Sequence, residues 1–564
     1  MSEHDASALR KPGWRGAAAI GLVLVASVLL FARLGHYPLW DDEATTAMFG
    51  RNVLETGDTS AVVGHNIIAF RGGRELVNLK LRYLPPLQYW AVAAGTALFG
   101  DANFAARFPF ALAGLLTFLT IAVWMTREQA CPLTWAGLSV ALLCNVSLLL
   151  FCRQCRYYGL AIFFSVLVAY LYMTWDGRRY RLLALSAASL ALLASNYLNF
   201  IALFAVIAVD YAFWRRKGQR LAPADWATWL APVLVLGLPI VLLFNPLGKG
   251  IVHEEQVNWL VKRVTLLWWH VRDLNECEFG VGLLLLAAPF VALATRDRWL
   301  ARAWVAFAVF ILVTSLISPQ PITVTTYADI RYLVPLIPLC AYIGVRVICL
   351  GTGGRTWLAL PIVLICFGTN IVHGTWTHAH RVRNPIARSD LRSTIAMFCG
   401  ELARPQRSPF GLTADWVNDN IPDNANVWVV PDYALYPLML YAPHPVYGYQ
   451  LREPVDPQFA DLPDVHVIGR VPPDYVICFG PPGLRELQAN LEALARLGAR
   501  YEPVAALDVA YRDTTRPELF WHEFKTVTAF NKDVEGVYVW RRFGAPTRNT
   551  AEAAPARNPE PAAE

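Results

Sequence analysis

Eleven stretches of mainly apolar residues constrain this 564-residue chain more than any other feature. A helix needs roughly 20 such residues to cross the hydrocarbon of a bilayer, with about 17 to 25 tolerated. The sequence therefore predicts a polytopic α-helical membrane protein with about 11 transmembrane helices. The stretches cover residues 17–33, 108–125, 134–151, 159–175, 181–196, 199–214, 226–244, 280–294, 302–318, 332–350 and 356–373.

The composition supports this prediction. Hydrophobic residues make up 55% of the chain and charged residues only 16%, and the mean hydropathy is +0.37. Soluble domains carry roughly 25% charged residues, so a soluble cytosolic enzyme is excluded. The net charge of +6 is too small to indicate a nucleic-acid partner. The lipid bilayer is the expected environment.

The basic residues orient the chain. With eleven spans, the short connectors that are rich in Arg and Lys all fall on the side of the N-terminus, which the positive-inside rule makes cytoplasmic. A further apolar stretch at 86–99 would break this agreement if it spanned, so we expect an interfacial or re-entrant helix there. Two long outer loops result, at 34–107 and 245–280, and the second has the pattern of an amphipathic interfacial helix.

The composition changes near residue 375, where charged residues return and short β-rich runs alternate with helical segments. This pattern predicts an α/β domain over 375–545, after a membrane module over 1–374. The odd number of spans makes this domain extracytoplasmic. Residues 546–564 are rich in Ala, Pro and Glu, which predicts a disordered tail.

Acidic residues follow the first span directly, in the segment Trp40-Asp41-Asp42-Glu43. A carboxylate at the membrane surface is able to take a proton from an acceptor hydroxyl or amine, or to bind a cation. An acid before a helical run is also a common N-cap. Asp42 and Glu43 are the catalytic candidates, and Mg²⁺ or Mn²⁺ stays an open alternative, with no metal ligands assigned.

Basic residues at predicted outer positions are candidates for binding a lipid phosphate, because the planar fork of Arg matches phosphate oxygens. Headgroup anchoring and pairing with the acids of the first loop are the competing interpretations. These candidates are Lys80 and Arg82 before a double proline, Arg153 and Arg156 at one span end, and Arg331 at another, where Tyr332 and Asp329 are further candidates for the same site.

Five segments in order resemble the C-type membrane glycosyltransferases (GT-C), in particular protein O-mannosyltransferases and the bacterial transferases that add aminoarabinose or galacturonic acid to lipopolysaccharide. The resemblance covers roughly residues 17–350. The matching segments are Asp42-Glu43, Pro85-Pro86-Leu87-Gln88-Tyr89-Trp90, Arg107–Gly114, Arg153–Tyr158 and Arg331–Pro335. The chain departs from many relatives at Leu84, where they carry Lys or His, and from some at Gln154, where they carry Glu.

The resemblance implies an inverting glycosyltransferase that uses a polyprenyl-phosphate sugar on the outer face of a bacterial inner membrane. The acceptor would be lipid A or another glycolipid, a protein or a polysaccharide. Asp42 would be the general base and Glu43 would position Asp42 or the acceptor, with substrate contacts from Tyr89, Tyr332 and Asp329. The donor phosphate would be bound by Arg153, Arg156, Tyr158, Lys80, Arg82 and Arg331.

Three other functions remain open from the sequence. A non-catalytic lipid-binding or assembly protein would use the same arginines without turnover. A transporter or flippase of lipid-linked sugars would also have many spans, although internal repeats and broken helices near the midplane are then usual. An oligosaccharide ligase is the nearest alternative among enzymes.

Overall fold

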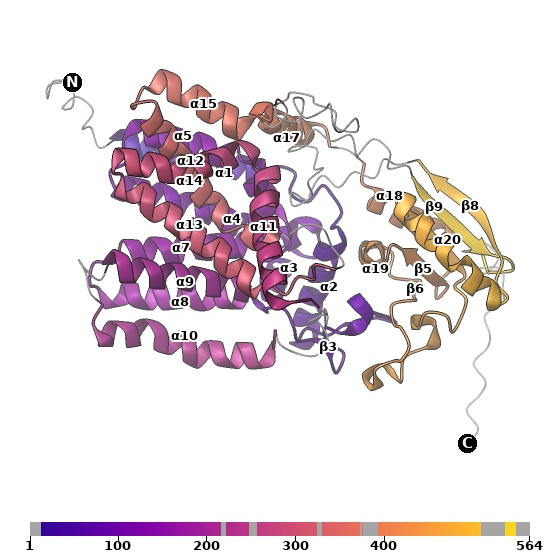
Figure 1. The fold of residues 1–564 in the computed structure, drawn as a ribbon. Coiled ribbons are helices and arrows are strands. Elements are labelled where there is room, and N and C mark those ends of the chain that lie inside the picture. The colour runs from indigo at the N-terminus through magenta and orange to yellow at the C-terminus, as the bar shows by residue number, and fades with distance from the viewer. Residues whose placement is uncertain are drawn as a thin grey trace, which may run out of the picture. The chain divides into compact units, whose positions relative to one another are not determined.

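The structure, a computed structural model, describes residues 13–215, 221–246, 257–323, 330–372, 375, 393–405, 407–508 and 536–548 (Figure 1). The described residues divide into two compact units. The helical unit contains residues 13–36 and 83–405, and the α/β unit contains residues 37–82, 407–508 and 536–548. Each unit has a hydrophobic cluster of its own. Most of the predicted disordered tail lies outside the described residues.

Each of the eleven predicted spans coincides with helix in the structure. Four helices are long and apolar enough to cross a membrane, or up to six spans if two bent helix pairs each count as one. The number eleven stays a prediction, because several of the other helices are short. The helices are α1 (Gly13–Phe31), α3 (Leu87–Phe99), α4 (Asn103–Arg127), α5 (Pro132–Leu143), α6 (Val146–Arg153), α7 (Tyr158–Met173), α8 (Arg179–Ser195), α9 (Tyr197–Phe213), α10 (Pro223–Leu243), α11 (Trp259–Cys277), α12 (Phe279–Thr295), α13 (Arg298–Ile317), α14 (Leu336–Gly351), α15 (Thr356–Gly368) and α17 (Thr394–Ala403).

One predicted span, at 134–151, is two helices that meet at a bend of 55°. The side chain of Asn145 accepts a hydrogen bond from the Leu148 amide at 2.8 Å and so caps the N-terminus of α6. Asn favours such local bonds over a continuous helix. The bend therefore has a cause in the sequence, and α6 ends at Arg153, one of the predicted site residues.

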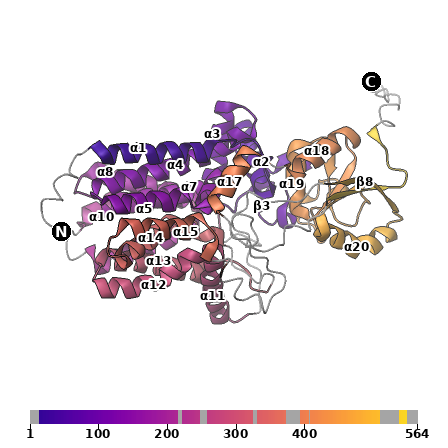
Figure 2. The same cartoon turned by 90° about the horizontal axis from the view of Figure 1, so that it is seen from above.

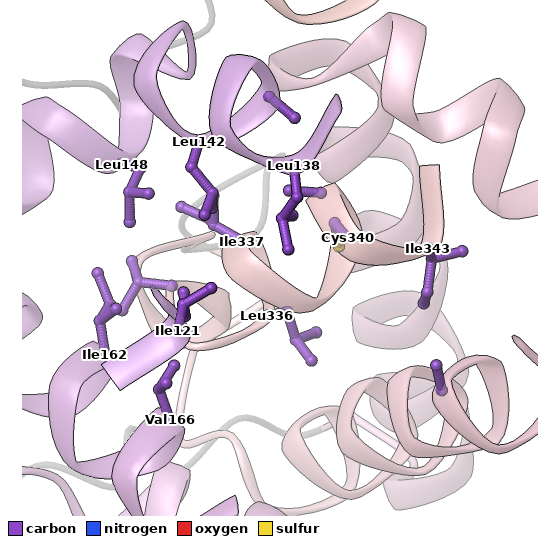
Figure 3. Close-up of a cluster of buried hydrophobic side chains, with 14 of the residues drawn as sticks. Ile121, Leu138, Leu142, Leu148, Ile162, Val166, Leu336, Ile337, Cys340 and Ile343 are labelled. Atoms are coloured by element: carbon purple, nitrogen blue, oxygen red, sulfur yellow. The ribbon is translucent and has the colours of Figure 1, made fainter. Parts of the chain in front are cut away.

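The core of the helical unit is aliphatic and aromatic, and Figure 3 shows part of it, with side chains from α4, α5, α6, α7 and α14. Figure 2 shows α1, α5, α14 and α12 of this unit running alongside one another. Where α4 and α7 cross, Gly159 lies against the main chain of Phe110. A Cβ at residue 159 would be 2.7 Å from the Phe110 carbonyl oxygen. Glycine is required there because two backbones approach closely.

The second predicted outer loop contains α11, whose axis makes an angle of 114° with α12 (Figure 1). Leu260, Val264, Trp268 and Val271 recur at helical spacing and are exposed, with 61% exposure for Leu260 and Trp268. An exposed apolar face of this kind is typical of a helix that lies in a membrane interface. The interfacial position itself stays a prediction.

The α/β unit is built on a five-stranded sheet of order β6-β5-β7-β9-β8. β5 (Asn426–Val430) pairs in parallel with β6 (Val446–Tyr447) and with β7 (Tyr475–Phe479), and β9 (Val537–Arg542) runs antiparallel to β7 and to β8 (Tyr501–Leu507). β5 and β7 are almost wholly buried runs, as expected for central strands. The helices are α18 (Pro409–Asn420), α19 (Leu435–Tyr441) and α20 (Gly480–Arg496).

The domain boundaries differ from the prediction in two respects. Residues 393–405, expected in the α/β domain, belong to the helical unit and include α17. Residues 37–82, expected as an outer loop of the membrane module, belong to the α/β unit. They form α2 (Asp41–Thr56) and two hairpins, β1 (Val62–Val63) with β2 (Asn66–Ile67), and β3 (Leu76–Val77) with β4 (Lys80–Leu81).

Hydrogen bonds between distant parts of the sequence hold this segment in the α/β unit. The Asn66 side chain accepts from the Tyr447 amide at 2.7 Å and donates to the Pro445 carbonyl at 2.9 Å. The Gln450 side chain accepts from the Ala69 amide at 3.0 Å and donates to the Ile67 carbonyl at 2.7 Å. Such contacts are not visible in local sequence patterns. Composition and hydropathy therefore assign residues 37–82 to the membrane module instead.

Candidate functional site

The predicted catalytic acids lie in the first turn of α2. Asp42 is half-buried, whereas Glu43 is fully buried. Asp41 Oδ1 accepts from the Asp42 amide at 2.6 Å, so Asp41 satisfies a donor at the helix N-terminus. Negative charge is favourable at this end of a helix because of the helix dipole. The acids are therefore held on a rigid element rather than on an irregular loop.

Further acids gather near the start of α2, within the α/β unit. Tyr436 on α19 is buried, and its burial raises the pKa of its hydroxyl well above the usual value. The negative charges of Asp432, Glu75, Asp41 and Asp42 raise the pKa further. The sequence analysis missed Asp432 and Glu75, since no local signal links residues so far apart in the chain.

Lys80 and Arg82, two of the predicted phosphate ligands, both form ion pairs with Asp58. Arg82 binds the carboxylate through two parallel bonds, Nη1–Oδ1 at 2.8 Å and Nη2–Oδ2 at 2.6 Å. Lys80 Nζ lies 2.9 Å from Asp58 Oδ2. The hydrogen bond from Arg82 is the largest cause that holds the pKa of Asp58 far below its usual range. These two cations thus have a carboxylate partner within their own unit.

Arg153, at the end of α6, binds the C-terminal end of α1. Its Nη1 donates to the carbonyls of Leu29 and Leu30, and its Nη2 donates to that of Ala32, each at 2.9 Å. The last carbonyls of a helix have no partner inside that helix, so Arg153 satisfies three of them.

Arg156 and Tyr158 lie at the start of α7, in the helical unit. Arg156 is 9% exposed, and its guanidinium carbon is 5.7 Å from the centre of the Tyr157 ring. The rings of Tyr157 and Tyr158 meet edge to face at 4.5 Å. Arg331, from the 3-10 turn Ile330–Leu333, lies with its Nη1 3.4 Å from the Tyr158 hydroxyl. The structure therefore brings Arg156, Tyr158 and Arg331 into one neighbourhood.

Three predicted substrate contacts have different outcomes. Tyr89 on α3 is 1% exposed and so belongs to the interior of the helical unit. The main-chain carbonyl of Tyr332 accepts from Asn199 Nδ2 at 2.7 Å, which ties its turn to α9. Asp329 lies outside the described residues.

The predicted site residues are divided between the two units. Asp42, Glu43, Lys80 and Arg82 belong to the α/β unit, and the other phosphate candidates belong to the helical unit. Within the described parts of the chain, no group of three or more His, Cys, Asp or Glu side chains is placed to hold a metal ion.

Comparisons with known proteins bear on the fold. No family model matches the chain. An uncharacterised protein of Aquifex aeolicus (strain VF5) is 26% identical over 319 residues, a match that covers 53% of this chain and 59% of that protein. The chain thus spans less than two thirds of the length of this curated relative.

Two crystal structures of ArnT from Cupriavidus metallidurans are similar to this chain. One is bound to undecaprenyl phosphate, with a TM-score of 0.52, and the other is in the apo state, with a TM-score of 0.53. Both are 16% identical, and each comparison covers 93% of this chain and 98% of ArnT. The resemblance to the C-type membrane glycosyltransferases, expected from five sequence segments, is therefore confirmed at the level of the fold.

Proposed function

We propose that the protein is an inverting glycosyltransferase that moves a sugar from a polyprenyl-phosphate donor to an acceptor on the outer face of a bacterial inner membrane. The observation that carries the proposal is the fold that this chain shares with ArnT over 93% of its length. The ArnT crystal structure in that comparison is bound to undecaprenyl phosphate. The membrane-spanning helices of the helical unit agree with a lipid-linked donor. The N-terminus would be cytoplasmic and the α/β unit extracytoplasmic.

In this proposal the donor phosphate is bound by Arg153, Arg156 and Arg331, with Tyr158 beside them. Bond cleavage at the anomeric carbon leaves negative charge on the phosphate, and fixed guanidinium groups stabilise that charge as it develops. Lys80 and Arg82 share the single carboxylate of Asp58, so this cluster keeps a net positive charge and both remain further candidates for binding the phosphate. Tyr89, Tyr332 and Asp329 remain candidates for sugar or acceptor contacts.

Asp42 is the proposed general base. It takes the proton of the acceptor hydroxyl or amine while the acceptor oxygen or nitrogen attacks the anomeric carbon from the side opposite the phosphate. Glu43, fully buried one residue away, fixes the first turn of α2 and so positions Asp42. A positioned base of this kind contributes about 10²- to 10⁴-fold to the rate.

The test uses purified protein in lipid nanodiscs with a panel of radiolabelled polyprenyl-phosphate sugars and a membrane-lipid extract as acceptor. We expect label transfer from one donor, and a loss of about 10²- to 10⁴-fold in Asp42→Asn. Asp41→Asn is the matched control, because its amide oxygen still accepts from the Asp42 N–H and it removes an adjacent charge. We expect this control to stay near the wild-type rate.

Two results would contradict the proposal. If a folded Asp42→Asn variant transfers sugar at the wild-type rate, Asp42 is not the general base. Binding and release of lipid-linked sugar with no label moved to any acceptor or to water would favour a carrier instead. Isolation of the labelled product identifies the acceptor as glycolipid, protein or polysaccharide, and distinguishes transfer of one sugar from transfer of an oligosaccharide block.

A further inference from the structure

The helical unit contains a cavity of about 490 Å³ among α4, α5, α7, α9, α13 and α14. Small-molecule sites in proteins occupy about 300–1,000 Å³, so this volume is large enough for a ligand. Along α13 its lining runs from Trp299 to Phe310. At 1.5 Å per residue this distance is about 16 Å, roughly half of the ~30 Å hydrocarbon thickness of a bilayer. The cavity therefore has the length of one membrane leaflet.

The polarity of the cavity wall changes along this length. One end is hydrocarbon apart from Ser165, and Figure 3 shows four of its side chains, Ile121, Leu138, Val166 and Leu336, from four different helices. The other end carries Trp124, Trp299 and Tyr342 together with charged side chains. An apolar body with an aromatic and charged end matches the polarity profile of a membrane lipid.

The apolar part of the cavity is poorly suited to water. Water enters cavities that offer it several polar partners, whereas apolar cavities stay dry and take apolar ligands. A dry void also leaves its lining without dispersion contacts on one side. A hydrocarbon chain is the occupant that restores those contacts.

The charged end of the cavity contains two ion-paired arginines. Arg302 binds Asp210, with its Nη2 2.6 Å from Oδ2. Arg346 binds Asp297 through Nε at 2.9 Å and Nη2 at 2.5 Å. A guanidinium has five N–H donors in a planar fork, so each arginine keeps donors that its carboxylate does not use. Their side chains are 19% and 31% exposed, within reach of a phosphate at the helix ends.

The charge of this end of the helical unit is positive overall. Among the described residues, eleven arginines and five acids lie at the helix ends on the side of the unit where the cavity carries its charged residues. Basic pockets between membrane helices are a recurring way of binding anionic lipid headgroups. The arginines are Arg15, Arg127, Arg178, Arg179, Arg181, Arg215, Arg296, Arg298, Arg302, Arg346 and Arg355, and the acids are Glu128, Asp176, Asp210, Asp225 and Asp297.

We propose that this cavity binds one anionic phospholipid, one of whose two acyl chains fills the apolar part and whose phosphate binds Arg302 and Arg346. The headgroup end of this site differs from the proposed donor site. On α7, Tyr158 begins the helix at the donor site, whereas Met173 ends it at the charged end of the cavity, fifteen positions or about 22 Å further along. The apolar part comes nearer to the donor site, since Ser165 and Pro335 also line the cavity, seven positions from Tyr158 and four from Arg331. The phospholipid is thus a resident component that fills the bundle rather than a substrate.

The first experiment measures which lipid stays with the protein. Protein purified in mild detergent is reconstituted in nanodiscs of phosphatidylcholine with or without phosphatidylglycerol, extracted again, and weighed by native mass spectrometry. We expect one phosphatidylglycerol retained per chain. Two arginines favour an anionic lipid by about 5-fold each, or about 30-fold together, over the zwitterionic lipid.

Two variants of α13 test the place of binding. Ala306 lines the cavity, and Ala306→Phe puts a ring into the space of the acyl chain. Ala308→Phe is the matched control, since Ala308 lies two residues away and does not line the cavity. We expect retained lipid to fall to background in the first variant and to stay unchanged in the second, with Asp42→Asn also unchanged.

A third variant tests the headgroup contact without leaving a buried charge alone. Arg346→Gln combined with Asp297→Asn replaces the ion pair by a neutral hydrogen-bonding pair, and we expect it to lose about 5-fold in preference for the anionic lipid. Retention of a polyprenyl phosphate in place of a phospholipid would overturn the proposal. So would equal retention in Ala306→Phe and wild type, or the absence of any bound lipid from wild type.

Discussion

The contact between α4 and α7 allows a stability change to be worked out from the structure. A Cβ added at Gly159 would lie 2.7 Å from the Phe110 carbonyl oxygen, whereas ordinary contact begins near 3.4 Å. In Gly159→Ala the two helices must therefore separate by roughly 0.7 Å. The obstacle is main chain, so no side chain is able to rotate away.

This separation costs dispersion energy on both sides of the crossing. A radial gap of about 0.5–1 Å removes a quarter to a half of the dispersion energy of each atom pair, which is about 0.1–0.2 kcal/mol at optimal distance. One buried side chain makes about 40–60 such atom contacts. Loss over the surface of one side chain gives about 1–6 kcal/mol. Overpacked cores typically lose about 1–3 kcal/mol, which we take as the expected destabilisation.

The assay is the unfolding temperature of the purified protein, read by fluorescence-detected size-exclusion chromatography. Gly21→Ala in α1 is the matched control, because a Cβ there meets nothing within 4 Å. Alanine favours a helix over glycine by about 1 kcal/mol, so this variant should unfold at or above the wild-type temperature. Gly159→Ala should unfold several degrees lower. An unfolding temperature for Gly159→Ala equal to that of Gly21→Ala would refute the packing argument.

Three further predictions concern the α/β unit. Arg82 holds the pKa of Asp58 far below its usual range, so the ion pair stabilises the folded state above about pH 4 and this stability is lost as the pH falls toward the folded pKa. Melting curves of Asp58→Asn should lack this acid dependence. Burial lowers the pKa of His466, so the unfolded chain binds a proton first and stability should fall below about pH 6.5. His466→Phe should weaken that loss in the same measurement. Gln450→Ala removes the acceptor of the Ala69 amide and should cost about 1–3 kcal/mol, seen as faster hydrogen exchange at Ala69, and unchanged exchange would contradict this contact.

The helical unit was largely predictable because hydropathy is a local property. Each apolar stretch forms helix near its predicted bounds, and the double proline before Leu87 precedes α3 as expected. The bend between α5 and α6 was not predicted, although Asn145 is the residue that caps the second helix. A polar residue within an apolar run is a weak signal because it is also tolerated inside a helix.

The candidate site was predictable as a set of residue types but not as a set of partners. Arg153 binds carbonyls of α1 that lie more than 120 positions earlier in the chain. Arg82 binds Asp58, which is 24 positions away and which the sequence analysis did not single out. Long-range pairs of this kind follow from the tertiary fold. Local patterns in a single sequence do not identify such partners, and only the resemblance to a family of known fold indicates that these segments come together.

The insertion of residues 37–82 into the α/β unit also sets the order of assembly during synthesis. Asn66 and its partner Tyr447 are 381 positions apart. A ribosome adds about 5–20 residues each second, so the segment waits roughly 20–75 s for its partner. During that time α3 to α17 are made, while α2 and the two hairpins lack the residues of the α/β unit that bond to their segment. The catalytic candidates are thus assembled only when the chain is nearly finished, and a truncated copy would leave this segment open to proteases.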